Sequence, residues 1–219
     1  METVWRQKSR ETWQKEGDRN SRFFHLSTVI RRKRNSIDAI KSDSGDWIIS
    51  KSEIKKFVVS KFIDLFTEES ISFPSGLDNL ISPTISSMQN KALCNIPTPL
   101  EIKNVIFGMY NLKAPGPDEL LALFYKQYWP IVGESVIFVV QNFFRSGHML
   151  NEVNNLFIVL IPKITNPSSV NHFRPISLCN MVYKFIAKIL VSRMRPLLAN
   201  LISPCQSTFI SYRWIAENQ

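Results

Sequence analysis

The chain has 219 residues, enough for one large domain or two small ones, and its 44% hydrophobic content is ordinary for a globular protein. Its net charge of +9 favours an anionic partner, most often nucleic acid, although a solvated basic surface has the same composition. The 3 cysteines and 3 histidines are scattered, which excludes a readable disulfide framework or metal-ligand spacing and is typical of a reducing compartment.

Targeting signals and membrane spans are not recognisable in the sequence. The first ten residues are polar and charged, which predicts no secretory signal peptide. No apolar run reaches the roughly 18 residues that a membrane span needs. We therefore expect an intracellular protein, nuclear or cytoplasmic and not secreted, with no membrane partner.

Positive charge is concentrated near both ends of the chain. Residues 1–34 hold ten Lys/Arg against four Asp/Glu, residues 150–215 hold seven against one, and the rest hold ten against thirteen. Two basic ends around a mildly acidic middle favour two contact surfaces over general solubility.

The N-terminal segment, residues 5–34, predicts two helices broken at Gly17, with Asp18 as the N-cap of the second. Four consecutive cations end it: Arg31, Arg32, Lys33 and Arg34. Cations suit the negative end of a helix dipole. A charged helix end is therefore one interpretation, and a nucleic-acid contact or an import signal is the other.

Residues 37–49 predict a β-hairpin, because two short apolar runs flank a turn that contains Gly45. Ser50 and Glu53 have the spacing of a capping box, which predicts the start of a helix. The apolar residues of this helix share one face that we expect in a core: Ile54, Phe57, Val58, Phe62 and Leu65.

The middle of the chain begins with a stretch that resembles a linker. Residues 67–97 are rich in Ser, Pro and Asn, with a short helix predicted near 85–92. Thr98 as N-cap, with Pro99 and Glu101 in the first turn, predicts a helix to about residue 112.

The motif Lys-Ala-Pro-Gly-Pro-Asp at 113–118 stops that helix, because two prolines around a glycine impose a non-helical loop. Two further helices are predicted, over residues 119–128 and 130–145. Gly147 is suited to end the second of them.

The last third predicts a strand over 156–161 that ends at Pro162, a polar loop, and a short returning segment over 174–178. Asn180 is placed to cap a long helix over 181–198, which is apolar almost all round. The cationic exceptions in this helix are Lys184, Lys188, Arg193 and Arg195. These elements make a helix-rich α+β chain with an incomplete sheet.

Several motifs follow one another along the chain. They are Lys-Ala-Pro-Gly-Pro-Asp at 113–118, Leu-Ile-Pro-Lys at 160–163, Phe-Arg-Pro-Ile-Ser-Leu-Cys-Asn at 173–180 and Tyr-Lys at 183–184. In this order and spacing they resemble the reverse transcriptase of non-LTR (LINE-type) retrotransposons. Residues 13–32 resemble the segment just ahead of that polymerase, and residues 203–209 resemble its SPxQSAF stretch.

This resemblance implies the fingers and the start of the palm of a right-hand polymerase. It divides the chain into a basic helical segment with a hairpin (1–66), a linker (67–97), and truncated reverse transcriptase fingers with the palm entry (98–219). The strand, loop and strand over 156–178 would be the fingers hairpin that covers the incoming nucleotide.

Two hairpin residues match nucleotide-contacting residues of the family. Arg174 matches the arginine that contacts the triphosphate, and Lys163 matches the lysine that faces the same pocket. A planar guanidinium can hold phosphate oxygens in pairs, which suits this role; the alternative is that both are only surface charges. The expected nucleic-acid contacts are Arg31, Arg32, Lys33, Arg34, Lys184 and Lys188.

The chain departs from the family pattern at three places. Glu119 stands where the family has a glycine, in a turn that we expect to need a positive φ, which glutamate tolerates poorly. Residues 211–213 replace the Pro-Gly-Arg of the family, and Glu217 stands where the family has aspartate.

Template-directed polymerases hold two Mg²⁺ ions with aspartates, but no aspartate follows Asp118. We expect Asp118 to cap the following helix rather than bind a metal. The sequence thus predicts no catalytic residue, no metal ligand and no cofactor in this chain, and the Mg²⁺ ligands of the full-length family would lie beyond Gln219.

Three functions stay open. The first is a truncated reverse transcriptase fragment, inactive alone, with RNA and DNA as partners and a deoxynucleoside triphosphate bound weakly if at all. The second is a basic nucleic-acid-binding module. The third is a non-functional retroelement relic.

Overall fold

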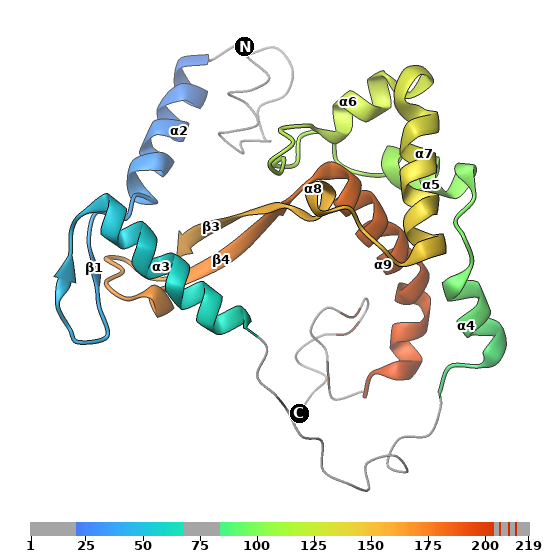
Figure 1. Ribbon diagram of the computed structural model, residues 1–219. Helices are drawn as coiled ribbons and strands as arrows, with labels where there is room; N and C mark the ends of the chain where they lie inside the picture. Colours follow the sequence, from blue (N-terminus) through green and yellow to red (C-terminus); the bar gives the residue numbers. More distant parts are fainter. Residues whose placement is uncertain (1–20, 68–83, 204–205, 207–209, 211–212, 214–219) are drawn as a thin grey trace, which may run out of the picture. The chain divides into compact units, whose positions relative to one another are not determined.

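The computed structural model of the chain describes residues 21–67, 84–203, 206, 210 and 213. The predicted helix before Gly17, the predicted N-cap Asp18 of the helix after it, and most of residues 203–219 lie outside the described residues, as does part of the predicted linker. The described chain forms two compact units (Figure 1). The first combines residues 21–67 with 157–178, and the second combines residues 84–156 with 179–203.

The first unit contains helices and two small antiparallel hairpins. Its elements are α2 (Ser21–Arg34), β1 (Ile40–Lys41), β2 (Trp47–Ile48), α3 (Lys51–Phe66), β3 (Leu156–Pro162), a short 3₁₀ helix (Val170–His172) and β4 (Phe173–Cys179). Strand β1 pairs with β2, and β3 pairs with β4.

The core of the first unit is closed by a residue from β4. Ile40 of β1, Ile54 of α3 and Phe173 of β4 are buried against one another. The Lys41 amide also donates to the Ser168 carbonyl over 2.7 Å, which ties the loop of the long hairpin to β1. Burial of these large apolar side chains is the main favourable contribution to folding of this unit.

The predicted hairpin at 37–49 is confirmed, with Ile40 opposite Ile48 and Gly45 at φ 93° in the turn. The predicted capping box of α3 is wrong. Ser50 is the N-cap residue but makes no side-chain cap hydrogen bond, because its hydroxyl pairs with the hydroxyl of Ser52 instead.

The predicted core face of α3 is confirmed for most of its length. Ile54 and Phe62 are buried, and Phe57 and Val58 are partly buried against the same cluster. Leu65 is an error, since its side chain is 66% exposed. The last turn of α3 extends past the buried cluster.

The second unit is helical. Its elements are α4 (Ser87–Cys94), α5 (Pro99–Phe107), α6 (Ala122–Gln127), α7 (Trp129–Ser146), α8 (Asn151–Asn154) and α9 (Met181–Leu201). Its buried core comes from four of them: Ile102, Ile106, Ala122, Tyr125, Val136, Val140, Met181, Phe185, Ile186 and Ile189. The long helix α9 therefore buries one face along its first three turns, against α5, α6 and α7.

Most predicted helix ends in the second unit are confirmed. The Thr98 hydroxyl accepts a hydrogen bond from the Glu101 amide over 3.1 Å, which starts α5. Gly147 ends α7 in the left-handed conformation at φ 69°. Helix α5 ends at Phe107 rather than near residue 112, because Gly108 is its C-cap. The short helix α8 was not predicted.

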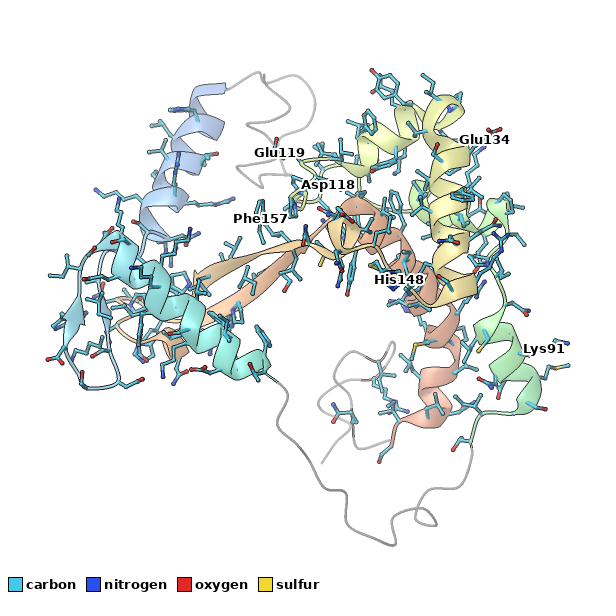
Figure 2. All side chains as sticks on the ribbon, in the orientation of Figure 1. Lys91, Asp118, Glu119, Glu134, His148 and Phe157 are labelled. Atoms are coloured by element: carbon cyan, nitrogen blue, oxygen red, sulfur yellow. The ribbon has the colours of Figure 1, made fainter. Side chains whose placement is uncertain are left out.

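Glu119 occupies the conformation that the sequence indicated was unfavourable for it, at φ 54° in the loop before α6 (Figure 2). A side chain in this left-handed region costs roughly 1–2 kcal/mol. We expect Glu119→Gly to raise the free energy of unfolding by about 1 kcal/mol, measured by urea denaturation. Asn166→Gly is the matched control, since Asn166 has φ 56°. This change should raise the free energy of unfolding less, because asparagine tolerates the left-handed region. A loss of stability in Glu119→Gly would contradict the strain.

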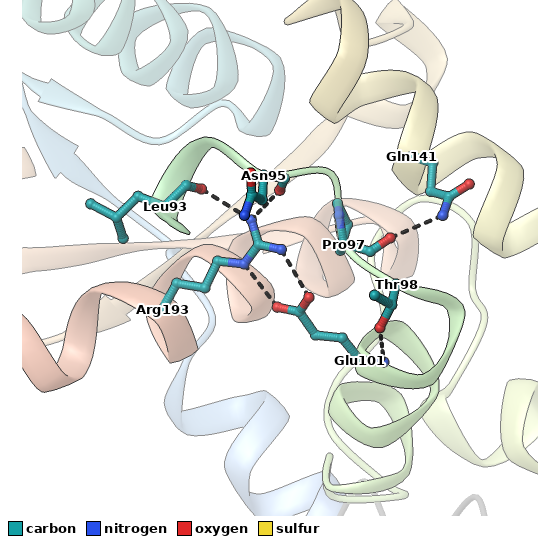
Figure 3. Close-up of polar contacts among 7 residues, drawn as sticks. All are labelled: Leu93, Asn95, Pro97, Thr98, Glu101, Gln141 and Arg193. Atoms are coloured by element: carbon teal, nitrogen blue, oxygen red, sulfur yellow. Dashed lines mark hydrogen bonds and ion pairs between the residues drawn. The ribbon is translucent and has the colours of Figure 1, made fainter. Parts of the chain in front are cut away.

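Arg193 of α9 links three other helices, and Figure 3 shows its hydrogen bonds to Glu101, Leu93 and Asn95. Its guanidinium donates two hydrogen bonds of 2.8 Å to the Glu101 carboxylate. The same group donates to the carbonyls of Leu93 and Asn95 at the end of α4. It also lies over the ring of Phe144, 5.2 Å from the centroid. One side chain thus joins α9 to α4, α5 and α7.

Candidate nucleotide and nucleic-acid site

The β3–β4 hairpin brings Lys163 and Arg174 to the same end. The Lys163 amide donates to the His172 carbonyl over 2.8 Å, so these two residues, which lie just beyond the paired ends of β3 and β4, continue the antiparallel register. By this register Arg174 is opposite Ile161 and is the diagonal neighbour of Lys163 on the same face. Diagonal neighbours on one face stand roughly 7 Å apart, a separation that one polyphosphate can span.

The face that carries these cations is the open face of the hairpin. Alternation along β3 places Ile158 and Leu160 on the other face, where they line an apolar cavity of about 640 Å³ together with α3. The open face carries Phe157 and Val159; their side chains are exposed, as is that of Ile158 beside the cavity. Figure 2 shows Phe157 on the side of β3 that is turned away from α3.

Both cations are accessible. Lys163 is exposed, and its ammonium group donates to the Asn171 carbonyl over 2.9 Å. Arg174 is exposed and makes no hydrogen bond or ion pair within the described part of the chain. Its guanidinium keeps its donors for a ligand, and the Lys163 ammonium group has two more. The geometry is therefore compatible with a phosphate-binding pair.

The first unit carries much of the positive charge. Its described residues hold twelve Lys/Arg against five Asp/Glu. The predicted cluster forms the last turn of α2, where Arg32, Lys33 and Arg34 are exposed and Arg31 is partly buried. A helix C-terminus favours such cations, so both interpretations of the cluster given above are compatible with this position.

A loop far back in the sequence caps the start of α9. One carboxylate oxygen of Asp118 accepts from the Met181 amide over 2.7 Å, and the other accepts from the Leu120 amide over 3.3 Å. The expectation that Asp118 caps the following helix is wrong, because α6 begins after Leu121 without a side-chain cap and the Asp118 carboxylate caps α9 instead. Asn180 is the N-cap residue of α9, as predicted, but its side chain makes no cap hydrogen bond.

The buried side chain of Asn180 instead links two other segments to the start of α9. Its oxygen accepts from the Asp118 amide over 2.9 Å, and its amide group donates to the Glu152 carbonyl over 2.7 Å. It therefore fastens the 114–118 loop and α8 to the start of α9. A sequence offers little signal for such a contact, because the partners lie far apart along the chain.

The two predicted lysines of α9 differ in their surroundings. Lys188 is exposed. The ammonium group of Lys184 is partly buried and donates to the Ala114 carbonyl over 2.7 Å. Burial lowers the pKa of Lys184 from its ordinary value, whereas the Asp118 carboxylate acts in the opposite direction. Nucleic-acid contact by either residue stays a prediction.

No cluster of three or more His, Cys, Asp or Glu side chains with a geometry suited to a metal ion occurs among the described residues. In the same part of the chain, no helix is both long and apolar enough to cross a lipid bilayer.

Comparison with known proteins gives one informative similarity. The chain is 27% identical over 203 residues to the Transposon TX1 uncharacterized 149 kDa protein of Xenopus laevis. The match covers 92% of this chain and 15% of that protein, so the chain spans about one seventh of its relative's length. No protein-family model matches the chain. The similarity supports a transposon-related origin.

Proposed function

We propose that this chain is the fingers and palm-entry region of a non-LTR reverse transcriptase, an RNA-directed DNA polymerase, and that its β3–β4 hairpin binds the incoming nucleotide. The observation that carries the proposal is the placement of Lys163 and Arg174 as exposed neighbours on the open face of that hairpin. The order of the sequence motifs and the similarity to a transposon protein support it.

The proposed binding rests on the opposite charges of the triphosphate and of the two hairpin side chains. A triphosphate carries several negative charges, and the guanidinium of Arg174 can donate to two phosphate oxygens at once. Lys163 adds a second positive charge beside it. The apolar side chains farther along the open face, such as Val159, offer surface to the rest of the nucleotide.

In this proposal, the metal-dependent step is carried out by residues outside this region. Two Mg²⁺ ions in such a polymerase are held by aspartates, and the only carboxylates after Asp118 are Glu119, Glu134, Glu152 and Glu217. These residues are too widely spaced to fit a paired metal site. We propose that this region positions the nucleotide and that residues outside it supply the metal ligands.

The nucleic-acid partners in this proposal are an RNA template and the DNA product. Arg31, Arg32, Lys33 and Arg34 of α2, with Lys184 and Lys188 of α9, are the proposed backbone contacts. Contacts of this kind neutralise phosphates, so affinity should fall steeply with salt.

Substitution of Arg174 tests the nucleotide site directly. We expect Arg174→Ala to weaken binding of dTTP by about tenfold or more, the effect of losing one charge-assisted hydrogen bond of about 1.5 kcal/mol. Lys163→Ala should weaken it less, because its ammonium group is shared with Asn171. Isothermal titration calorimetry of the full chain with dTTP measures both.

Two controls make the result interpretable. Lys56→Ala removes an exposed cation of α3 and should leave dTTP binding unchanged. Thymidine, which lacks phosphates, should bind equally to wild type and Arg174→Ala. If Lys56→Ala and Arg174→Ala weaken dTTP alike, the hairpin is not a nucleotide site. In that case the excess of cations in the first unit favours the second candidate, a basic module that binds nucleic acid through charge.

A further inference from the structure

We propose that the first unit carries a docking groove for an acidic amphipathic helix from outside this chain. The α3 groove is the apolar cavity of about 640 Å³ that α3 forms with β3 and Ile37. On β3 it uses the face opposite to that of Lys163 and Arg174. It does not depend on nucleotide binding by the hairpin, so it goes beyond the proposed function.

The part of the groove that α3 supplies is a continuous helical stripe. Its lining residues recur at spacings of three and four from Lys51 to Phe66, which are the first and last residues of the helix. At 1.5 Å per residue the stripe is about 22 Å long. Ile158 and Leu160 supply the β3 side within the same unit, and Figure 1 shows α3 beside this strand.

Only the inner edge of the stripe is covered by the core of the first unit. Ile54 and Phe62 are buried. Several other lining side chains remain open to solvent: Val59 is 48% exposed, Ile63 60%, Phe66 65% and Ile158 42%. Large apolar side chains that gather around one open groove indicate a surface that a partner covers.

The charges of the groove are all of one sign. Among the described residues that line it, nine are apolar and the other two are Lys51 and Lys55. Both lysines are exposed, and they lie one turn apart at the N-terminal end of α3, where the helix dipole is also positive. The carboxylates of α3, Glu53 and Asp64, do not line the groove, because the helical period places them on the opposite side of the helix.

Nothing within the described part of the chain neutralises these two lysines. The carboxylates that form ion pairs there, Asp43 and Glu101, contact Lys61 and Arg193 instead. One end of an apolar groove therefore presents two free positive charges. A partner that complements it has an apolar face along most of its length and negative charge at one end.

The length and openness of the groove favour a helix over a small ligand. A small molecule is normally buried over most of its surface in its site, whereas the walls of this groove are about half exposed. An α-helix of about 15 residues matches the length of the stripe. Such a helix can lay apolar residues at i, i+3, i+4 and i+7 into the groove, with acidic residues at the end beside Lys51 and Lys55.

The test uses a synthetic helical peptide of about 15 residues as the probe. It carries leucines at helical spacing along one face and two glutamates, one turn apart, at one end. A second peptide has lysines in place of these glutamates. Fluorescence anisotropy with the full chain at about 0.15 M salt measures both, since distant charges are largely screened there. Wild type should bind the glutamate peptide about tenfold more tightly.

Charge variants test the cationic end of the groove. Lys51→Glu/Lys55→Glu should reverse the preference, so that the lysine peptide binds more tightly. Lys55→Glu alone should reduce the preference by about threefold or more. Lys56→Glu is the matched control, because this exposed neighbour on α3 does not line the groove, and it should leave the preference unchanged.

An apolar variant tests the wall of the groove. Ile63→Asp should weaken both peptides by about tenfold or more, because it places a charge where leucine side chains would pack. Ile30→Asp, on α2, is the matched control and should change neither affinity, since Ile30 is 65% exposed but lies outside the groove. Circular dichroism should show the same helix content in both variants, because both side chains are largely exposed.

Four results would overturn the proposal. They are equal binding of the two peptides by wild type, binding of neither peptide, equal effects of Lys55→Glu and Lys56→Glu, and equal effects of Ile63→Asp and Ile30→Asp. Sedimentation of the wild-type chain adds a fifth. Self-association that Ile63→Asp abolishes would assign the groove to a second copy of this chain instead of an acidic helix.

Discussion

Replacement of Gly116 by alanine is expected to lower the free energy of unfolding of the second unit by about 4 kcal/mol or more. A Cβ atom at this position would lie 2.3 Å from the Cys179 carbonyl carbon, 2.4 Å from its oxygen and 2.5 Å from the Asn180 nitrogen. All three are backbone atoms at the start of α9, so no side chain can rotate away. The loop must separate from α9 to accept the methyl group.

Gly108→Ala is the matched control, since its Cβ would meet a carbonyl oxygen only at 3.3 Å and its φ is ordinary for a helix end. It should change stability by less than about 1 kcal/mol. Urea denaturation measures both variants, and hydrogen exchange at the Met181 amide reports the lost cap. Equal stability of the two variants would contradict the close approach seen at Gly116.

Removal of the Arg193 guanidinium should have the second largest effect. We expect Arg193→Met to cost about 3 kcal/mol, because it leaves a half-buried carboxylate on Glu101 and two carbonyls at the end of α4 without their donor. Arg193→Lys should cost less, since it keeps the charge but loses the paired hydrogen bonds. Arg195→Met, an exposed cation on the same helix, should stay within about 0.5 kcal/mol of wild type.

The pH dependence of stability gives an independent readout of this pair. The hydrogen bonds and the charge of Arg193 hold the pKa of Glu101 below its ordinary value of 4.5, against the opposing effect of burial. A carboxylate with a depressed folded pKa contributes stability above its unfolded pKa, and the contribution is lost as pH falls through the folded value. Arg193→Met should therefore flatten the loss of stability below about pH 4.5. An unchanged acid profile would mean that the pair contributes nothing.

Local elements were the most predictable part of this fold. The pattern around Thr98 and Pro99 predicted the start of α5, and Gly147 predicted the end of α7. These signals are local, because caps and turns are set by neighbouring residues. The contact between Asp118 and Met181 was not predictable, since it depends on how two distant segments pack.

The candidate site was partly predictable for the same reason. The motifs selected Lys163 and Arg174, and strand alternation could place them on one face of a hairpin. The sequence did not indicate that this hairpin packs on α3 through Phe173, because apolar residues do not specify their partners.

Phe173 has a consequence for the order in which the protein matures. It closes the core around Ile40 and Ile54, but it is separated from them in the sequence by residues 84–156 of the second unit. A ribosome therefore releases residues 21–67 well before their core can form, and their apolar surface is available to chaperones and to aggregation until the hairpin emerges. A peptide that stops at residue 67 would never complete this core, because it lacks Phe173.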